Sequence, residues 1–339
     1  MKLKRYEGNP VLGPLPGSPW QTACNTNPAA WRDNGKVMML YRAGPNTKKH
    51  PIHFGLAESR DGFSFKRVSR KPVFSPSKDG FDGGCVEDPR VVKFGDTYFV
   101  TYATRMFPPS AYWTKRYRLN EHNPRLPRET PWVVRENMTR TGLAATKDFK
   151  TWYRLGPITP ASVDNRDVII FPEQVNKQFV MLHRPASWSG AGYPCSRPSI
   201  WISVSDDMLT WSGNSLLAQP VYPWECHKIG ANAPPIKTKQ GWLTLYHGVD
   251  ETITYRVGAL MLDLKNPRRV IARTPEPILE PEADYERKGL IPNVVFPCGN
   301  IVLGKTFFVY YGGADKVCCV ATAPLKDVVD YVMAHPWKD

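Results

Sequence analysis

The sequence predicts an all-β fold, namely a five-bladed β-propeller with a short C-terminal helix. One hairpin pattern recurs five times along the 339 residues. The 33 prolines and 25 glycines argue against long helices, and the 11 Trp, 15 Tyr and 14 Phe residues favour strands with aromatic packing. A β-sandwich is the alternative, but a sandwich does not repeat at this interval. We expect a single domain that spans residues 1–339.

Each repeat has a polar turn followed by four or five apolar or aromatic residues that end in Tyr or His. These end residues lie 61 to 81 residues apart and are Tyr41, Tyr102, His183, Tyr246 and Tyr311. A short apolar strand precedes each turn, as in DPRVVKF before GDTYFVTY, so each repeat begins with a strand–turn–strand hairpin. Five units of about four antiparallel strands each are typical of a propeller.

A third strand follows each hairpin, and in three repeats it runs into a Ser/Thr-x-Asp turn. The segments are FGLAESRDGFSFKR, GLAATKDFKTWYR and WISVSDDMLTWSG. We expect each Asp to hold its turn by accepting hydrogen bonds from backbone N–H groups. The fourth repeat has VGALMLDLKNPRRVIAR at this place, and the fifth ends in VCCVATAPL and a short helix, LKDVVDYVMAH.

The longest interval between repeats contains an inserted segment at about residues 106–137. This segment is polar and rich in proline, and it also carries aromatic residues. Loops of this length are usually functional or disordered, and the aromatic residues favour an ordered, functional rim over one face of the propeller.

The formal net charge of +14 comes from Lys and Arg residues that are spread over the whole chain. This spread favours either a generally basic protein or a positive field that attracts small anions, rather than a nucleic-acid binder. No apolar run is long enough to cross a membrane, and the charged start MKLKRYEGNP has no secretory signal. Seven cysteines without a CxxC pair read as reduced thiols, so we expect a cytoplasmic protein without a metal site.

Polar residues recur where the first strand of each repeat begins, which in a propeller is the face where the blades converge. Fourteen residues before the Tyr of repeats one, two and four stand Asn27, Asp88 and Asn232. The matching stretches begin at Arg166-Asp167 in repeat three and at Pro292-Asn293 in repeat five. Any single one of these residues is explained as a turn residue, but five on one ring favour a site.

The segment GGCVEDPRVV is the most distinctive of these strand starts. Neighbouring residues on a strand project to opposite sides, so we expect Asp88 to face the channel and Glu87 to turn away from it. Arg90, two residues further on, is expected on the same side as Asp88. The alternative interpretation is a salt-bridged turn without a catalytic role.

Four segments together resemble glycoside hydrolase family 130. They are VEDPRVV, the FPEQV…MLHRP run, KIGANAPPIKT…GWLTLYHGV and PNVVFP…YYGGAD, and the resemblance extends from about Asn27 to Ala323. It implies an inverting β-mannoside phosphorylase on a five-bladed propeller, an enzyme of the glycosyltransferase type that releases α-mannose 1-phosphate. The single catalytic residue of the family falls on Asp88, which protonates the leaving oxygen through the 3-hydroxyl of the mannose while phosphate attacks the anomeric carbon.

Inorganic phosphate is then the co-substrate, and no other cofactor is implied. An inverting hydrolase needs a second carboxylate to activate water, whereas a phosphorylase needs cations to hold the phosphate anion. The family's phosphate-holding positions match Arg166, Lys228 and His247, and Arg184 is a further cation able to face the same site.

The resemblance also implies a set of residues that bind the sugar by hydrogen bonds. These are Asn27, Arg42, Arg90, Tyr255, Asn293 and Asp315. Tyr112, Trp113 and Trp132 in the inserted segment are candidates for stacking on the sugar of the leaving group, although packing of the segment explains them equally well.

Two alternatives to a phosphorylase stay open. One is a β-mannosidase on the same fold, with Glu173 or Glu225 as the base, and the other is a propeller that binds carbohydrate without turnover. A nucleotide-dependent transferase is disfavoured because no Gly-rich phosphate loop is present. We expect a β-1,4 linkage in the substrate, and the resemblance favours a homo-oligomer without nucleic-acid or membrane partners.

Overall fold

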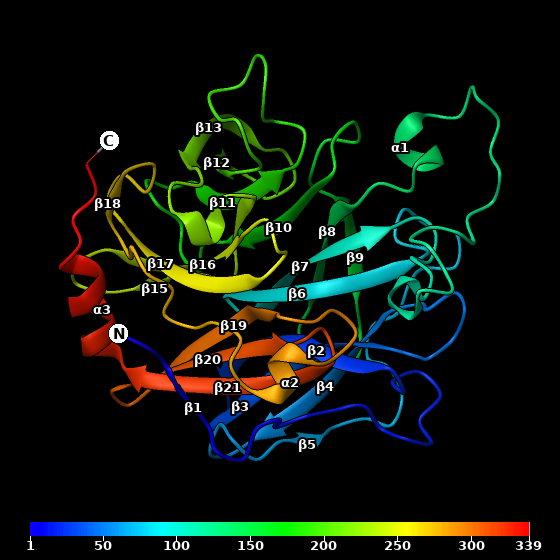
Figure 1. Cartoon of the computed structure of the whole chain (residues 1–339), viewed down its shortest axis with the longest axis horizontal. Helices are drawn as coiled ribbons and strands as arrows, with labels where there is room; N and C mark the ends of the chain where they lie inside the picture. The colour runs from blue at the N-terminus through cyan, green and yellow to red at the C-terminus, as the bar shows by residue number, and fades with distance from the viewer. Residues whose placement is uncertain (339) are drawn as a thin grey trace.

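The structure is a computed structural model that describes residues 1–338. It contains five separate antiparallel sheets, which confirms the five-bladed β-propeller (Figure 1). Neighbouring blades meet along their innermost strands, because β2 contacts β6 and β19, and β10 contacts β6 and β14. These five strands therefore surround the axis on which the functional site depends.

Blades one to three each consist of four strands in chain order. Blade one is formed by β2 (Cys24–Asp33), β3 (Lys36–Gly44), β4 (His53–Ser59) and β5 (Lys66–Arg67). Blade two is formed by β6 (Cys85–Phe94), β7 (Thr97–Arg105), β8 (Arg140–Thr146) and β9 (Tyr153–Pro157). Blade three is formed by β10 (Asn165–Ile170), β11 (Phe179–Pro185), β12 (Ile200–Ser205) and β13 (Ser212–Ala218).

Blades four and five depart from this plan. In blade four the inner strand is split in two, and the strands are β14 (Lys228–Ala231), β15 (Ile236–Lys237), β16 (Trp242–Val249), β17 (Tyr255–Leu262) and β18 (Val270–Arg273). Blade five is formed by β19 (Val295–Leu303), β20 (Thr306–Gly313), β21 (Val317–Pro324) and the N-terminal β1 (Lys4–Arg5).

Strand β1 closes the ring by pairing with β21. Arg5 within it forms ion pairs of 2.8 Å with Glu282 and 2.9 Å with the fully buried Glu286. The repeats do not predict this strand, because a two-residue strand has no detectable period. Blade five thus joins the two ends of the chain in one sheet.

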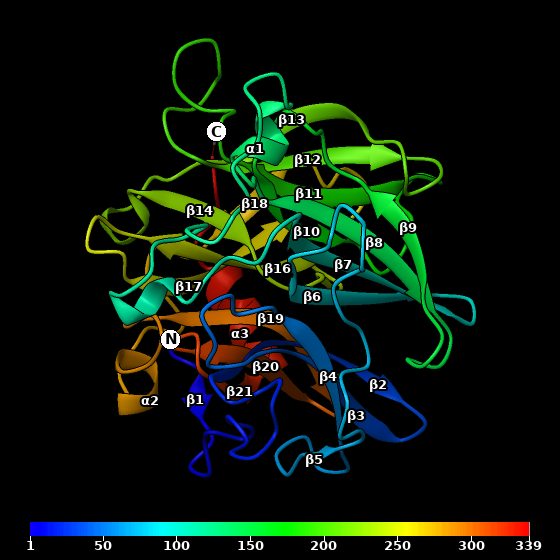
Figure 2. The same ribbon diagram turned by 90° about the vertical axis from the view of Figure 1, so that its right-hand side faces the viewer.

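The helices are short. They are η1 (Tyr112–Thr114), α1 (Trp132–Arg135), η2 (Pro223–Glu225), α2 (Asp284–Arg287) and α3 (Leu325–Met333), of which α3 is the predicted C-terminal helix. The inserted segment at 106–137 carries η1 and α1 and runs in front of the blades in Figure 2. Within residues 1–338, no helix has the length and hydropathy needed to span a membrane.

The aspartate turns form as predicted. Asp61 accepts hydrogen bonds from the backbone N–H groups of Phe63 and Ser64, each at 2.8 Å. Asp148 and Asp207 make the same pair of contacts in the next two blades, and Asp263 does so in blade four. Each turn thus satisfies backbone donors that the end of a strand leaves unpaired.

The repeated tyrosines lie in the core between the sheets, where their hydroxyl groups need partners. Tyr41, Tyr102, Tyr246 and Tyr311 are all fully buried. Their hydroxyls donate to Gln21, Asp82, Glu225 and Glu286 respectively, at 2.7 to 3.2 Å. The tyrosine at the end of the second strand therefore links that strand to a polar side chain from elsewhere in the chain.

All seven cysteines carry free thiols.

Candidate active site

Three innermost strands are interrupted by a residue in the left-handed region of backbone space. These residues are Asn27 (φ 48°), Asp88 (φ 50°) and Asp167 (φ 57°), and each lies at an irregularity in the pairing of its strand. Asn and Asp tolerate this conformation better than other residues with a side chain, but it is still strained. Strained backbone of this kind is common at functional sites. Here the side chains of all three residues point into the same cavity.

The cavity has a volume of about 300 Å³ and lies where the inner strands converge. Nine of the eleven predicted site residues line it: Asn27, Arg42, Asp88, Arg166, Arg184, Lys228, His247, Tyr255 and Asp315. Seven further residues complete the wall: Glu87, Tyr112, Asp167, Ile253, Ile291, Val294 and Phe296.

Two predicted residues do not line the cavity. Arg90 is buried beneath it, where Nη1 donates to the carbonyl of Asp88 at 2.7 Å and Nε donates to the carbonyl of Asn232 at 2.9 Å. Arg90 thus supports the strained backbone rather than the cavity wall. Asn293 is exposed, and its carbonyl accepts a hydrogen bond of 3.0 Å from the backbone of Tyr255.

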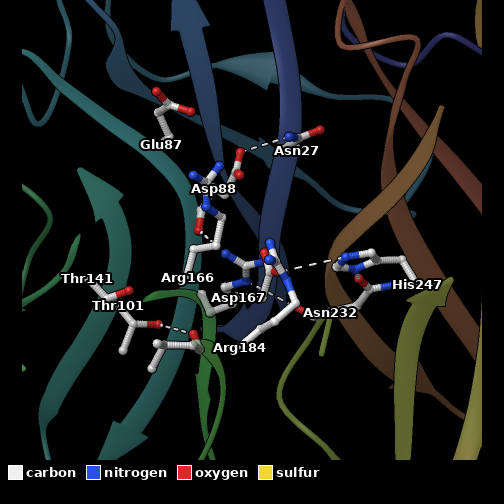
Figure 3. Close-up of polar contacts among 12 residues, drawn as sticks. Asn27, Glu87, Asp88, Thr101, Thr141, Arg166, Asp167, Arg184, Asn232 and His247 are labelled. Carbon is white, nitrogen blue, oxygen red and sulfur yellow. Dashed lines mark hydrogen bonds and ion pairs between the residues drawn. The ribbon is translucent and has the colours of Figure 1, made fainter. Parts of the chain in front are cut away.

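One side of the cavity, which we call the acidic half, consists of Asn27, Arg42, Glu87, Asp88 and Asp315. Asp88 Oδ1 accepts a hydrogen bond of 2.7 Å from Asn27 Nδ2 (Figure 3). The same oxygen lies 3.2 Å from Arg42 Nη1. Asn27 Nδ2 also lies 3.4 Å from Asp315 Oδ1. Three carboxylates therefore share one guanidinium and one amide.

The expectation that Glu87 turns away from the cavity is wrong. Glu87 lines the wall, and its Oε2 lies 3.5 Å from Arg42 Nη1. The alternation of side chains holds only on a regular strand, and the left-handed Asp88 interrupts β6 directly after Glu87. Both neighbouring carboxylates can then face the same space.

The surplus of negative charge affects the protonation of Asp315. Burial raises the pKa of this carboxyl group, and the nearby Asp88 and Glu87 raise it further against the opposing effect of Arg42. Burial works to lower the pKa of Arg42, but Glu87, Asp315 and Asp88 outweigh it and raise that pKa well above its ordinary value. The acidic half is therefore suited to holding a proton among its carboxylates.

The opposite side, which we call the basic half, consists of Asp164, Arg166, Asp167, Arg184, Lys228 and His247. Arg166 binds Asp164 through two hydrogen bonds, of 2.9 Å from Nε and 2.6 Å from Nη2. Arg184 Nε donates to Asp167 Oδ2 at 2.6 Å. Both carboxylates are thus occupied by guanidinium groups, and Lys228 supplies an additional cation.

Two bases in this half lose charge because of their surroundings. Burial, together with the nearby Arg184 and Arg166, lowers the pKa of Lys228 to about 7. Burial lowers the pKa of His247 to about 3, and its Nδ1 lies 2.8 Å from Asn232 Oδ1. His247 is therefore neutral at physiological pH, which the sequence does not reveal.

The aromatic residues of the inserted segment separate into different environments. Tyr112 lines the cavity, where burial raises the pKa of its hydroxyl. Trp113 packs edge-on against His50, with ring centroids 4.3 Å apart, and Trp132 is 41% exposed on α1. Of these three aromatic side chains, only Tyr112 therefore borders the cavity.

The two glutamates proposed as the base of a hydrolase lie outside the cavity wall. Glu173 is exposed and forms an ion pair with Lys237. Glu225 is fully buried between Arg273, at 2.5 Å, and the hydroxyl of Tyr246, at 2.9 Å. Among the described residues, 1–338, no group of three His, Cys, Asp or Glu side chains is arranged to hold a metal ion.

Sequence reasoning missed Glu87, Asp164 and Asp167 as parts of the site. The sequence could have indicated Asp167, because this residue directly follows Arg166 in the polar stretch that begins repeat three. The sequence does not indicate that Glu87 faces the cavity, since the orientation of its side chain depends on the backbone conformation of Asp88.

The arrangement places carboxylates opposite a cluster of cations within one small polar cavity. Carboxylates of this kind can donate or accept a proton, and Arg and Lys side chains bind phosphate oxygens. The geometry is therefore suited to a reaction between a neutral polar molecule and an oxyanion.

The chain is similar to several known proteins over nearly its whole length. The family model described as β-1,4-mannooligosaccharide phosphorylase matches residues 14–118 and 134–334. The 1,2-β-oligomannan phosphorylase of a Thermoanaerobacter species is 39% identical over 334 residues, which cover 97% of this chain and 99% of that protein. The β-1,4-mannooligosaccharide phosphorylase of Ruminococcus albus is 30% identical and covers 98% of this chain and 91% of its own.

A solved structure extends the similarity to three dimensions. The β-1,2-mannobiose phosphorylase of Listeria innocua, in complex with β-1,2-mannobiose, matches with a TM-score of 0.80 and 27% identity, covering 99% of this chain and 100% of that chain. The chain therefore belongs to glycoside hydrolase family 130, the family of the mannoside phosphorylases, and it is an enzyme of the glycosyltransferase type.

Proposed function

We propose that this protein is an inverting phosphorylase that cleaves a β-linked mannoside with inorganic phosphate and releases α-mannose 1-phosphate. The observation that carries this proposal is the division of one 300 Å³ cavity into an acidic half around Asp88 and a basic half with Arg166, Arg184 and Lys228. The two halves correspond to the two needs of the reaction, which are a proton for the leaving oxygen and cations for the attacking phosphate.

In this proposal Asp88 is the catalytic acid. Its proton reaches the oxygen of the leaving sugar through the 3-hydroxyl of the mannose, as the family resemblance implies. The bond between that oxygen and the anomeric carbon breaks, while a phosphate oxygen forms a new bond to the same carbon from the opposite face. Asn27, 2.7 Å from Asp88 Oδ1, and Arg42, 3.2 Å away, stabilise the carboxylate that remains.

The basic half binds the phosphate. Arg166 and Arg184 are oriented by Asp164 and Asp167, so that their remaining N–H groups are available in fixed directions. An inverting hydrolase would instead need a carboxylate base about 6.5–9.5 Å from the acid. Both glutamates considered for that role have other partners outside the cavity, which favours phosphorolysis.

The linkage that is cleaved is the finer part of the proposal. From the sequence we expect a β-1,4 linkage, and the description of the matched family model also names β-1,4-mannooligosaccharide. However, the relatives that are 39% and 34% identical are named as phosphorylases of β-1,2-oligomannan and β-1,2-mannobiose. We therefore propose a β-1,2-linked mannoside as the preferred substrate.

The test is a phosphorolysis assay against β-1,2- and β-1,4-linked mannobiose and β-1,4-mannosylglucose, with and without phosphate. Mannose 1-phosphate should form only in the presence of phosphate, and fastest from the β-1,2-linked sugar. Free mannose formed without phosphate would identify a hydrolase. Binding of all sugars without any product would identify a carbohydrate-binding propeller.

A further inference from the structure

Lys228 differs from the other cations of the basic half because it has no carboxylate of its own. Lys228 is the first residue of β14. The nearby carboxylates of Asp164 and Asp167 form ion pairs with Arg166 and Arg184 instead. Within residues 1–338, no carboxylate lies within ion-pair distance of Lys228 Nζ, which instead lies 5.2 Å from the centre of the Tyr255 ring. Its ammonium group would therefore be a surplus charge in a half-buried position.

The charged and titratable groups near Lys228 come from several strands. The carboxylates of Asp164 and Asp167, next to and on β10, lie beside the guanidinium groups of Arg166 and of Arg184 on β11. Arg90 on β6 lies 3.8 Å from Asp167, and the remaining neighbours are the neutral imidazole of His247 on β16 and the phenol of Tyr255 on β17. This arrangement explains why burial and the two arginines dominate and lower the pKa of Lys228 to about 7. A dianion placed among these groups changes the balance by two negative charges.

We propose that Lys228 couples phosphate binding to the uptake of one proton. In the empty cavity at mildly alkaline pH the side chain is an amine, and it becomes an ammonium ion when a phosphate dianion binds beside it. The proton comes from solvent, its N–H bond forms on the lone pair of Nζ, and no other bond changes. This inference rests on the proposed function, because it assumes that the basic half is the phosphate site.

The coupling predicts that the affinity for a dianion falls as the pH rises. Above about pH 7 the free enzyme must acquire a proton for each dianion that it binds, so the affinity should fall about tenfold per pH unit. Below that pH Lys228 is already protonated, and this contribution disappears. A permanently charged residue at position 228 would remove the pH dependence.

Titration calorimetry of the intact protein tests the proposal, with sulfate as the probe because this dianion does not titrate near neutral pH. Measurements at pH 8 in two buffers of different ionisation enthalpy give the number of protons taken up. We expect roughly 0.9 proton per sulfate, because an amine with a pKa of about 7 is about nine-tenths deprotonated at that pH. Inorganic phosphate serves as a second probe at pH 8.5, where it is almost entirely a dianion.

Two variants and one control assign the proton. Lys228→Arg should bind sulfate without taking up a proton, and its Kd should stay constant between pH 7 and 9, because a guanidinium group does not deprotonate. Lys228→Met should lose both the proton uptake and at least tenfold in affinity. Lys237→Arg, on β15 of the same blade at an exposed ion pair with Glu173, should behave as the wild type.

Uptake of fewer than 0.2 protons by the wild type would overturn the inference while leaving the phosphate site intact. Uptake by Lys228→Arg equal to that of the wild type would also overturn it and would assign the proton to another group, such as His247. Failure of both phosphate and sulfate to bind at all would instead refute the proposed function itself.

Discussion

Asp88 and Asp167 occupy the same position in neighbouring blades, yet their surroundings give them different roles. Both interrupt an innermost strand with a left-handed backbone, at φ 50° and 57°. Asp88 accepts a hydrogen bond from an amide and shares Arg42 with two other carboxylates. Asp167 lies 2.6 Å from Arg184, 3.6 Å from His247 and 3.8 Å from Arg90.

The difference teaches that the charge around a repeated position, and not the position itself, decides what the residue does. Asp88 lies beside two other carboxylates that share Arg42 with it, which suits the proton transfer proposed for this residue. Asp167 lies among positive charges, so its carboxylate is fixed and in turn fixes Arg184. In the proposed reaction, one backbone feature would thus serve proton transfer in one blade and anion binding in the next.

The largest expected effect comes from Asp88→Asn. The change is nearly isosteric but removes the proton donor, and general acid catalysis contributes about 10²–10⁴-fold. Steady-state phosphorolysis of an unactivated mannoside should show a loss in kcat of that size, with an unchanged circular dichroism spectrum. Asp96→Asn, at an exposed ion pair with Lys147 on the same blade, is the matched control. Retention of more than a tenth of the wild-type kcat would refute the assignment of Asp88.

The second effect concerns stability and should appear at Asp167 alone. Asp167→Asn leaves Arg184 buried without its carboxylate, and breaking a buried ion pair in this way costs about 3–5 kcal/mol. Urea unfolding should show this loss, and added phosphate should restore part of it by binding only the folded state. Asp88→Asn should unfold like the wild type. A loss below about 1 kcal/mol for Asp167→Asn would show that the pair is not structural.

The same pair should also limit stability in acid. Burial works to raise the pKa of Asp167, but Arg184, His247 and Arg90 overcome it and hold that pKa far below its ordinary value. A depressed pKa in the folded state stabilises the protein above the unfolded pKa, near about 3.9, and this contribution is lost as the pH falls below that value. The wild type should therefore lose stability below about pH 4 more steeply than Asp167→Asn, as measured by urea unfolding at a series of pH values.

The third effect separates the two halves kinetically. Lys228→Ala should raise the apparent KM for phosphate roughly tenfold to a hundredfold, because a hydrogen bond to a charged group contributes about 1.5–3 kcal/mol. The KM for the mannoside should change little, because the sugar is expected to contact the acidic half. Kinetics with both substrates varied independently measures this. Equal changes in both constants would indicate that Lys228 only supports the fold.

Much of this architecture follows from the sequence, because blades repeat and their hairpins carry a strong pattern. Counting back 14 residues from Tyr41 and Tyr102 gives Asn27 and Asp88, and both residues line the cavity. The count succeeds because the strand irregularity lies at the same distance before the tyrosine in both blades. In blade five the irregularity falls between Pro297 and Gly299, and Asn293 before it is exposed. Asn293 stands 18 residues before Tyr311 instead of 14, so the stretch assigned to repeat five begins before the irregular position.

Charge balance could not be predicted in the same way. Glu87 faces the cavity because of the backbone conformation of its neighbour, and the pKa of Lys228 is lowered by burial and by arginines from two other strands. The first property depends on the backbone conformation of one adjacent residue, and the second depends on contacts between blades that are distant in sequence. A pattern within one repeat carries no information about them.

The smallest effect tests which aromatic side chain of the inserted segment meets the substrate. Tyr112 borders the acidic half, since Asp315, Arg42 and Glu87 all influence its hydroxyl, whereas Trp132 lies exposed on α1. A favourable aromatic contact contributes about 0.5–1.5 kcal/mol, so Tyr112→Ala should raise the KM for the mannoside roughly twofold to tenfold. The KM for phosphate should stay constant, because phosphate is expected in the basic half. Trp132→Ala should leave both constants unchanged. If Trp132→Ala weakens the mannoside and Tyr112→Ala does not, the leaving sugar extends over α1 and the acidic half ends before the inserted segment.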